Sequence, residues 1–219
     1  MEQEVLTPWQ KQVITIISQR AVMQGFYLSG GTALSAYYLK HRISDDLDFF
    51  SEHDFDTVFI YALAREIGEA LSATNTRFVR HHDRYQFFYA VPGQPEEYRI
   101  EFARYPFKQL RSPIRRDGIL IDSELDIAVN KLMAITDRFD PKDFVDLYFL
   151  LQQYPLTELK SKLEQKFGVI VSPIFLGSEL SKARRIAALP KMLKPLTIED
   201  LKNFFSQQAQ SLRSQVLEE

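Results

Sequence analysis

Hydrophobic and polar residues alternate along this chain with two different periods. In its first half, apolar residues recur at every second position within residues 46–50 and 98–103, which is typical of strands with one buried face. Residues 55–73 lie between these runs and carry apolar side chains near every fourth position, which predicts an amphipathic helix. From Ser123 onward the helical period continues to the end of the chain. The pattern predicts an α/β fold, with a mixed sheet and flanking helices, followed by a helical C-terminal domain.

Turn and capping residues set the expected boundaries of the elements. Thr7 is typical of a helix start, and we expect that helix to end at Gly25. Residues 107–122 are expected to form a loop, so we place the domain boundary at its end, between residues 1–122 and 123–219. The other expected elements are a short strand before Gly30, a helix over 32–39, a hairpin over 76–91, a strand over 98–105, and helices over 124–137, 141–153, 157–167, 178–188 and 197–217.

Asp46 and Asp48 are the first candidates for chemistry. Residues i and i+2 of a strand point to the same face, so the two carboxylates project together and the apolar residues between and after them project to the other face. Two like charges side by side are unfavourable unless a positive charge lies between them. Mg²⁺ or Mn²⁺ would supply it, because hard cations prefer carboxylate oxygen. Two such ions about 3.5–4 Å apart bind both the attacking and the leaving oxygen of an in-line phosphoryl displacement.

Gly30 and Gly31 are placed to contact a phosphate. They follow an apolar run and precede a helix-like run that starts at Thr32. Glycine allows a sharp turn and lets a phosphate come close to the backbone, and a helix N-terminus offers free N–H groups to an anion. A Gly-Gly turn or an Asp-x-Asp triplet alone is common, but their combination here predicts a phosphate-binding turn beside a metal pair.

These segments resemble the signature of the nucleotidyltransferase superfamily, and more closely the AbiEii/AbiGii toxin family of nucleotidyltransferases. The resemblance covers residues 26–150 and does not extend over the rest of the chain. It implies an enzyme that moves a nucleoside monophosphate from a nucleoside triphosphate (NTP) to an acceptor hydroxyl, for which the 3′ end of a tRNA is one candidate. It also implies the toxin of a toxin–antitoxin or phage-defence system, with a cognate antitoxin as partner. The quoted segments are Ser29-Gly30-Gly31-Thr32-Ala33-Leu34, His41-Arg42-Ile43-Ser44-Asp45-Asp46-Leu47-Asp48-Phe49-Phe50, Asn130-Lys131-Leu132-Met133-Ala134 and Asp143-Phe144-Val145-Asp146-Leu147-Tyr148.

The resemblance also implies roles for individual residues. Asp46 and Asp48 would bind the metal ions. Arg42 and Ser44 belong to the family pattern, and they either contact the nucleotide or fix the loop before the aspartates. The residues expected to bind the nucleotide are Ser29, Gly30, Gly31, Thr32, Arg42, Ser44, Lys131 and Asp143.

Glu101 is the candidate for a third metal-binding carboxylate. It lies on the polar side of the predicted strand 98–105. In the superfamily, a carboxylate on a strand next to the Asp-x-Asp strand binds the metal that activates the attacking hydroxyl. The alternative interpretation is an exposed glutamate paired with Arg99 or Arg77.

Lys131 and two following aspartates are the candidates in the helical part. Lys131 lies among apolar residues, so it either extends its stem past them into solvent or contacts a nucleotide phosphate, as the resemblance implies. Asp143 and Asp146 are three residues apart and share a helix face. They either face water, hold Lys131 or join the catalytic centre, and we expect Asp146 to be the functional one. Lys142 replaces an arginine that is usual in the family, which leaves its ion pairing open.

Composition defines the setting of this chemistry. The chain has 219 residues, 45% of them hydrophobic, which suffices for one core with a helical addition. It contains no cysteine, which excludes disulfides and zinc–thiolate sites and favours a reducing cytoplasm. Residues 1–5 lack the features of a signal peptide. No apolar run approaches the roughly 20 residues that span a bilayer, so we expect no membrane association.

Net charge and local charge leave the acceptor open. The net charge of −2 does not indicate a nucleic-acid-binding protein. Basic clusters at 80–84, 111–116 and 182–185 either lie in solvent or contact the phosphates of an RNA acceptor. Two alternatives therefore remain: an enzyme of the same fold that modifies a protein or small-molecule hydroxyl, and a non-catalytic nucleotide-binding module. The presence of both glycines and both aspartates argues against the second.

Overall fold

The computed structural model describes residues 5–217, which form two compact units. The units are interleaved in sequence, because two short segments of the first half of the chain belong to the helical unit. The first unit contains the described residues up to Ala36 with Ser44–Lys108 and Ser112–Ser123, and the second contains Tyr37–Ile43, Gln109–Arg111 and the described residues from Glu124 onward.

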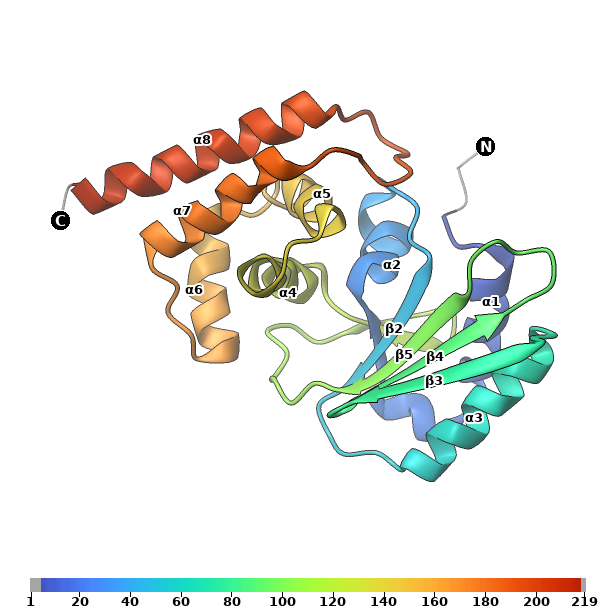
Figure 1. Ribbon diagram of the computed structural model, residues 1–219. Helices are drawn as coiled ribbons and strands as arrows, with labels where there is room; N and C mark the ends of the chain where they lie inside the picture. The colour runs from blue at the N-terminus through green and yellow to red at the C-terminus, as the bar shows by residue number, and fades with distance from the viewer. Residues whose placement is uncertain (1–4, 218–219) are drawn as a thin grey trace. The chain divides into compact units, whose positions relative to one another are not determined.

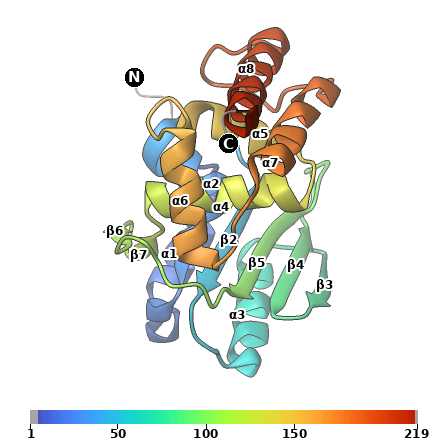
Figure 2. The ribbon, with the colours of Figure 1, turned by 90° about the vertical axis from the view of Figure 1, so that its left-hand side faces the viewer.

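The first unit is built on one mixed sheet, as the alternating pattern predicted. Its described strands are β1 (Tyr27–Ser29), β2 (Asp46–Ser51), β3 (Asn75–His81), β4 (Arg84–Ala90), β5 (Tyr98–Arg104), β6 (Ile114–Arg116) and β7 (Ile119–Ile121). They lie in the order β3-β4-β5-β2-β1-β7-β6, with β3 at one edge and β6 at the other (Figures 1 and 2). β2 runs parallel to β5 and antiparallel to β1, and β1 runs parallel to β7. This order places β2 at the centre of the sheet.

Alternation along β2 gives the sheet an apolar face and a polar face. Leu47 and Phe49 are buried on the apolar face, and Phe49 stacks on Phe102 of β5 with ring centroids 5.7 Å apart. The amphipathic helices α1 (Pro8–Ser18) and α3 (Thr57–Ala70) pack against this face. Figure 1 shows α3 below β3, and the Tyr89 hydroxyl of β4 donates a hydrogen bond to Ala64 O of α3 at 3.1 Å. The polar face carries Asp46 and Asp48.

Helix α1 begins as predicted but ends earlier. Thr7 and Gln10 form a capping box, in which the Gln10 side chain accepts a hydrogen bond from Thr7 N at 2.9 Å. The helix stops at Ser18 because Arg20 adopts an extended conformation, with φ −103° and ψ 114°. A separate 3₁₀ turn, η1 (Ala21–Gly25), then leads into β1. Gly25 therefore ends η1 and not α1.

Strands β6 and β7 form a hairpin in the segment that we predicted to be a loop (Figure 2). β7 is largely buried and pairs with β1, with Leu28 opposite Ile121. The turn residues Asp117 and Gly118 have φ values of 49° and 78°, and positive φ at both positions is what a type I′ hairpin turn requires. The loop prediction was wrong because β6 and β7 have three residues each and because Pro113 and Gly118 in this segment favoured a loop.

The second unit is helical, as predicted. Helix α7 begins at Pro173 and not at residue 178, because Ser172 caps it by accepting a hydrogen bond from Phe175 N at 3.2 Å. Helices α7 and α8 lie side by side in both views (Figures 1 and 2). Among the described residues, no helix is both long and apolar enough to cross a membrane. The elements are α4 (Glu124–Asp137), α5 (Pro141–Leu150), α6 (Leu156–Phe167), α7 (Pro173–Ser181), the 3₁₀ turn η3 (Lys182–Arg185) and α8 (Ile198–Leu217).

A buried ion pair connects the inserted segment 109–111 to the helices of this unit. Asp126 of α4 and Lys166 of α6 are buried, and their charged groups lie 2.6 Å apart. The Asp126 carboxylate also accepts hydrogen bonds from the main-chain N–H groups of Leu110 and Arg111, at 2.9 and 3.0 Å. Asp126 therefore joins three segments of the second unit.

Candidate active site

Asp46 and Asp48 lie side by side on the polar face of β2, as the alternation predicted. Their side chains are 32% and 16% exposed. Arg99 lies opposite Asp46 on the parallel strand β5. Its Nη2 atom is 2.8 Å from Asp46 Oδ2 and 3.4 Å from Asp48 Oδ1. A guanidinium therefore lies between the two carboxylates to which we assigned metal ions.

Arg99 was missing from the predicted site residues. Burial disfavours its charge, but Asp48 and Asp46 raise the pKa of its guanidinium, so the residue is charged in the folded protein. The available signal was its position two residues before Glu101, which puts both on one strand face. The resemblance implied that the strand of Glu101 lies next to the strand of the two aspartates, but it did not give the register, which places Arg99 opposite Asp46.

Glu101 lies next to the aspartate pair, opposite Asp48 in the register of β2 and β5. Its side chain is 1% exposed. Arg84 donates hydrogen bonds to its two oxygens, from Nε at 2.8 Å and from Nη2 at 3.0 Å, and Gln86 Nε2 donates a third at 2.6 Å. The alternative of an exposed glutamate is therefore wrong, and the ion-pair partner is an arginine of β4 that we did not consider.

Gly30 supports Asp48 from the adjoining turn. Its φ of +69° lies in the left-handed region, which glycine adopts without steric cost. A Cβ atom at this position would lie 2.6 Å from Asp48 Oδ2, which is closer than a van der Waals contact allows. The site thus requires glycine for two independent reasons, and the Asp48 side chain packs directly on the backbone of the turn.

The hydroxyl groups of Ser29 and Thr32, which we predicted to contact a nucleotide, form hydrogen bonds within the protein. The Thr32 hydroxyl donates a hydrogen bond to the main-chain oxygen of Asp46, which fixes Thr32 against the start of β2. The Ser29 hydroxyl donates to Asp122 Oδ2 at 2.7 Å. Ser29 and Thr32 therefore shape the turn and connect it to neighbouring segments.

Two further predicted residues are buried near the turn. The helix after β1, α2 (Gly30–Leu34), begins at Gly30, earlier than expected, contains the buried Gly31, and continues as the π-helical segment η2 (Ser35–Leu39). Ser44 is buried, and its main-chain oxygen accepts a hydrogen bond from Gln10 Nε2 at 2.8 Å. Gln10 of α1 thus holds the chain just before β2.

The predicted residues of the second unit form one buried ion cluster, made of Arg42, Lys131, Asp143 and Asp146. Arg42 binds Asp146 through two hydrogen bonds, from Nε at 2.6 Å and from Nη2 at 2.8 Å. Lys131 Nζ lies 2.6 Å from Asp146 Oδ2 and 2.7 Å from Asp143 Oδ1. Asp143 also pairs with Arg138, 2.9 Å away. The four cluster residues are buried, and Asp146 has no exposed surface.

The ionised forms of the cluster stabilise one another. Burial alone would raise the pKa of the Asp146 carboxyl, but Arg42 and Lys131 hold that pKa well below its ordinary value. Burial alone would lower the pKa of the Lys131 ammonium, but Asp146 and Asp143 raise it. The cluster therefore stays ionised at neutral pH.

These contacts decide between the interpretations left open for the cluster. Lys131 does not extend into solvent but is held by both aspartates, so the solvent-facing interpretations of all three residues are wrong. Arg42 also donates a hydrogen bond from Nη1 to Ile43 O at 3.0 Å, so in this structure it fixes the loop.

His41 belongs to the surroundings of the cluster and was not predicted. It is fully buried, and its Nε2 atom lies 2.7 Å from Asp146 Oδ1. Burial lowers the pKa of its imidazole and outweighs the opposing effect of Asp146, so His41 is neutral at pH 7. His41 begins one of the segments that carry the family resemblance, but we assigned it no role.

Two carboxylates near Asp46 suit a divalent cation, but a third ligand is not in place. Asp46 and Asp48 are partly exposed and already hold one positively charged group between them. Within residues 5–217, however, no group of three or more His, Cys, Asp or Glu side chains is arranged to hold a metal ion. Glu101 would first have to exchange its bonds to Arg84 and Gln86. Asp46 and Asp48 are therefore the residues that fit a cation in this arrangement.

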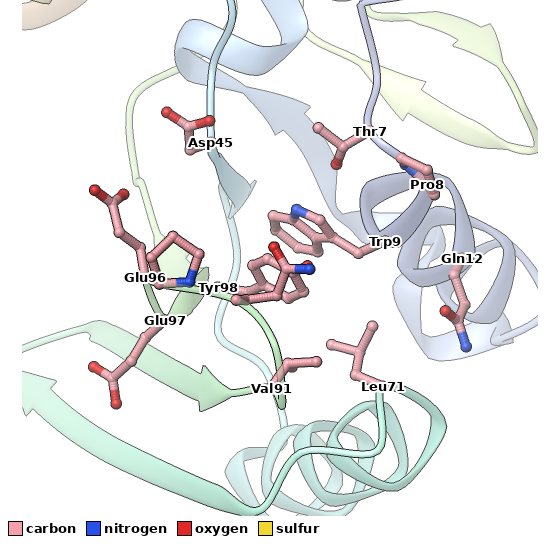
Figure 3. Close-up of a pocket in the computed structure, with 12 residues that line it drawn as sticks. Thr7, Pro8, Trp9, Gln12, Asp45, Leu71, Val91, Glu96, Glu97 and Tyr98 are labelled. Carbon is pink, nitrogen blue, oxygen red and sulfur yellow. The ribbon is translucent and has the colours of Figure 1, made fainter.

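A cavity of about 570 Å³ lies elsewhere in the first unit (Figure 3). Trp9 and Tyr98 stack in its wall with ring centroids 4.4 Å apart, and Asp45 also lines it. The described residues around it include none of the predicted site residues, so it is separate from the candidate active site.

Comparison with known proteins identifies the family of this chain. The family described as "Nucleotidyl transferase AbiEii toxin, Type IV TA system" matches residues 13–216, well beyond the part that carries the motif resemblance. "Uncharacterized protein aq_aa25" of Aquifex aeolicus (strain VF5) is 30% identical over 175 residues, which are 77% of this chain and 79% of that protein.

Two solved structures share the fold. JHP933 from Helicobacter pylori is 21% identical with a TM-score of 0.58, and the match covers 96% of this chain and 91% of JHP933. MenT4, the nucleotidyltransferase toxin Rv2826c from Mycobacterium tuberculosis H37Rv, is 16% identical with a TM-score of 0.58, and the match covers 93% of this chain and 81% of MenT4. The fold agrees with the family match over almost the whole chain, and this protein belongs to the AbiEii family of nucleotidyltransferase toxins.

Proposed function

We propose that this protein transfers a nucleoside monophosphate from an NTP to an acceptor hydroxyl, with a divalent cation held by Asp46 and Asp48. The carboxylate pair itself carries the proposal. Two partly exposed carboxylates share one face of a central strand, and the Asp48 side chain packs on the glycine turn. The Arg99 guanidinium carries one positive charge against these two negative charges, so the pair still suits a divalent cation.

The reaction needs positioning and charge neutralisation and no covalent enzyme intermediate. When bound, Mg²⁺ or Mn²⁺ would neutralise charge on the triphosphate and on the acceptor oxygen. The acceptor oxygen forms a bond to the α-phosphorus, the bond from that phosphorus to the bridging oxygen of the β-phosphate breaks, and pyrophosphate leaves. Gly30, Gly31 and Thr32 offer main-chain N–H groups to the phosphates. Glu101 is the candidate third carboxylate, which helps to take the acceptor proton after exchanging its present partners.

The buried ion cluster has a positioning role, because it fixes the chain segment that leads to Asp46. Its members are Arg42, Lys131, Asp143 and Asp146. Arg42 donates a hydrogen bond to the main-chain oxygen of Ile43, three residues before Asp46, and Asp146 fixes Arg42 with two hydrogen bonds. A direct contact of Lys131 with a nucleotide phosphate would require Lys131 to release one of its aspartates. Lys131 therefore has a structural role in the structure described here, and in the proposed reaction it would bind a phosphate of the nucleotide.

The acceptor and the biological role rest on the family. The resemblance suggests the 3′ end of a tRNA as the acceptor, and the description of the family as part of a Type IV toxin–antitoxin system supports a toxin with a cognate antitoxin. The proposed setting is the cytoplasm, where tRNA and NTPs are present.

A labelling experiment tests this function. The protein is incubated with Mg²⁺, total tRNA and each α-³²P-labelled NTP in turn, and the products are resolved on a denaturing gel. We expect label on RNA with the parent protein and none with Asp48→Asn. Asp45→Asn is the matched control, because it makes the same change at an exposed aspartate just before β2, and it should retain transfer. Label on protein would overturn the tRNA acceptor, and transfer by Asp48→Asn at the parent rate would overturn the assigned site.

A further inference from the structure

Arg99 occupies the position between Asp46 and Asp48 to which the proposed function assigns a divalent cation. Its Nη2 atom alone reaches both carboxylates, at 2.8 and 3.4 Å. Strand pairing fixes this arrangement, because Arg99 is the direct neighbour of Asp46 across β2 and β5. One of the two negative charges of the carboxylate pair is therefore balanced by the protein's own Arg99 side chain.

The attachment of Arg99 differs from that of two other arginines bound to carboxylates. Arg42 and Arg84 each bind one carboxylate through two nitrogens, Nε and Nη2. Such two-nitrogen pairs are the strong and geometrically specific form of the interaction. Arg99 contacts its aspartates through Nη2, while its Nε atom is buried without a hydrogen-bond partner. Of these three arginines, Arg99 is the one whose contacts are easiest to exchange.

Exchange must occur by movement of the side chain. An arginine guanidinium does not lose its proton in proteins, so its charge cannot be removed by deprotonation. Its side chain is 29% exposed, so the guanidinium has access to solvent on the polar face of the sheet. A cation approaching Asp46 and Asp48 from that face competes with Arg99 for the same oxygens.

We propose that Arg99 is a resident counter-ion of the carboxylate pair and that a divalent metal binds by displacing its guanidinium. This inference rests on the proposed function, since it takes Asp46 and Asp48 as metal ligands. Arg99 balances one of the two negative charges when metal is absent, and it lowers the affinity of the same two aspartates for metal. Arg99 thereby sets the metal concentration that the enzyme requires.

Binding of Mn²⁺ to the full chain, measured by isothermal titration calorimetry at an ionic strength of about 0.15 M, tests this inference. Arg99→Gln removes the charge and keeps a side chain of similar polarity. We expect it to bind Mn²⁺ about tenfold more tightly than the parent, because loss of one competing charge-assisted hydrogen bond corresponds to about that factor. Arg99→Lys keeps a competing cation, so its affinity should lie closer to that of the parent.

Arg77→Gln is the matched control. Arg77 lies in the same row of the sheet, two strands from Arg99, because Phe88 pairs with both residues. It pairs with Glu97 at 2.8 Å and contacts neither aspartate in the described contacts. Removing its charge should therefore change the Mn²⁺ affinity less than about twofold, because screening in water weakens charges at that distance.

The possible results separate this inference from the proposed function. Equal Mn²⁺ affinity of the parent and Arg99→Gln, with binding lost in Asp48→Asn, would overturn the displacement and leave the metal site standing. An equal gain in Arg99→Gln and Arg77→Gln would also overturn it, because a general charge effect would then suffice. Absence of Mn²⁺ binding in both the parent and Arg99→Gln would overturn the inference together with the metal site.

A second readout follows metal binding in the unmodified protein and uses a variant only to assign one signal. The arginine Nε–H signals are recorded by NMR during a titration with Mg²⁺, and the spectrum of Arg99→Lys assigns the Arg99 signal. We expect the Arg99 signal to shift with Mg²⁺ while the Arg77 signal stays. An unchanged Arg99 signal at saturating Mg²⁺ would contradict displacement.

Discussion

Replacing Asp146 by asparagine should destabilise the protein strongly. Asp146 has no exposed surface, and it contacts Arg42 through two nitrogens, Lys131 at 2.6 Å and His41 at 2.7 Å. The asparagine side chain would be isosteric but neutral, and one of its two terminal atoms would be a donor facing other donors. The substitution would leave two buried cations with Asp143 as the nearest compensating charge.

The expected loss follows from the burial of this pair. Removing one partner of a buried ion pair costs about 3–5 kcal/mol, mostly because the other charge stays buried without compensation. We therefore expect the free energy of unfolding at pH 7, from urea titrations followed by far-UV circular dichroism, to fall by about that amount. Asp137→Asn is the control, since Asp137 is exposed at the end of α4 and should lose no more than about 0.5 kcal/mol.

The pH dependence gives the same prediction a second test. The folded-state pKa of Asp146 lies well below its ordinary value, so the stabilisation is fully present above the unfolded pKa of about 3.9 and is lost as the pH falls through the folded value. The difference between the parent and Asp146→Asn should stay constant from pH 7 to about 5 and shrink below about pH 4. A loss below about 1 kcal/mol at pH 7 would refute the assignment of Asp146 as the centre of the cluster.

Two further predictions concern single residues. Gly30→Ala should lower the melting temperature more than Gly93→Ala, because both glycines have positive φ but only Gly30 would bring a Cβ atom within 2.6 Å of Asp48; equal losses would contradict the steric argument. His41→Gln should reduce the loss of unfolding free energy between pH 7 and 5. The folded-state pKa of His41 is lowered, so on acidification the unfolded state, with a pKa of about 6.5, takes up a proton that the folded state does not. Identical slopes of unfolding free energy against pH for the parent and the variant would contradict this.

The local part of the candidate site could be predicted from the sequence. Asp46 and Asp48 share a face because the period of a strand is two, and this holds whatever the strand pairs with. The requirement for glycine at position 30 also follows from a local turn. The close contact of Gly30 with Asp48, in contrast, depends on the tertiary structure. The helical second unit was predictable because its periodic runs are long, and α4 begins and ends at the predicted residues.

The parts that were missed depend on pairing between distant segments. Arg99 lies 53 residues after Asp46, and only the register of β2 and β5 brings the two together. Arg42 and Asp146 are 104 residues apart, and their burial as a pair is decided by tertiary packing. The strand β7 is too short to show a period, yet it is an inner strand of the sheet because it pairs with β1 on one side and with the edge strand β6 on the other. Periodicity in the sequence therefore identified the candidate carboxylates of the sheet, whereas the arginines that pair with the carboxylates are found only from the tertiary structure.

The most direct test of nucleotidyl transfer at Asp46 and Asp48 follows two phosphates of one NTP. The nucleotide that labels the acceptor is supplied either with α-³²P or with γ-³²P, and the fate of each label is followed with the parent protein and with Asp48→Asn. The account predicts that the α label appears on the acceptor, that the γ label appears in pyrophosphate, and that Asp48→Asn abolishes both. Transfer of the γ label to the acceptor would show phosphoryl transfer instead and would contradict the central claim.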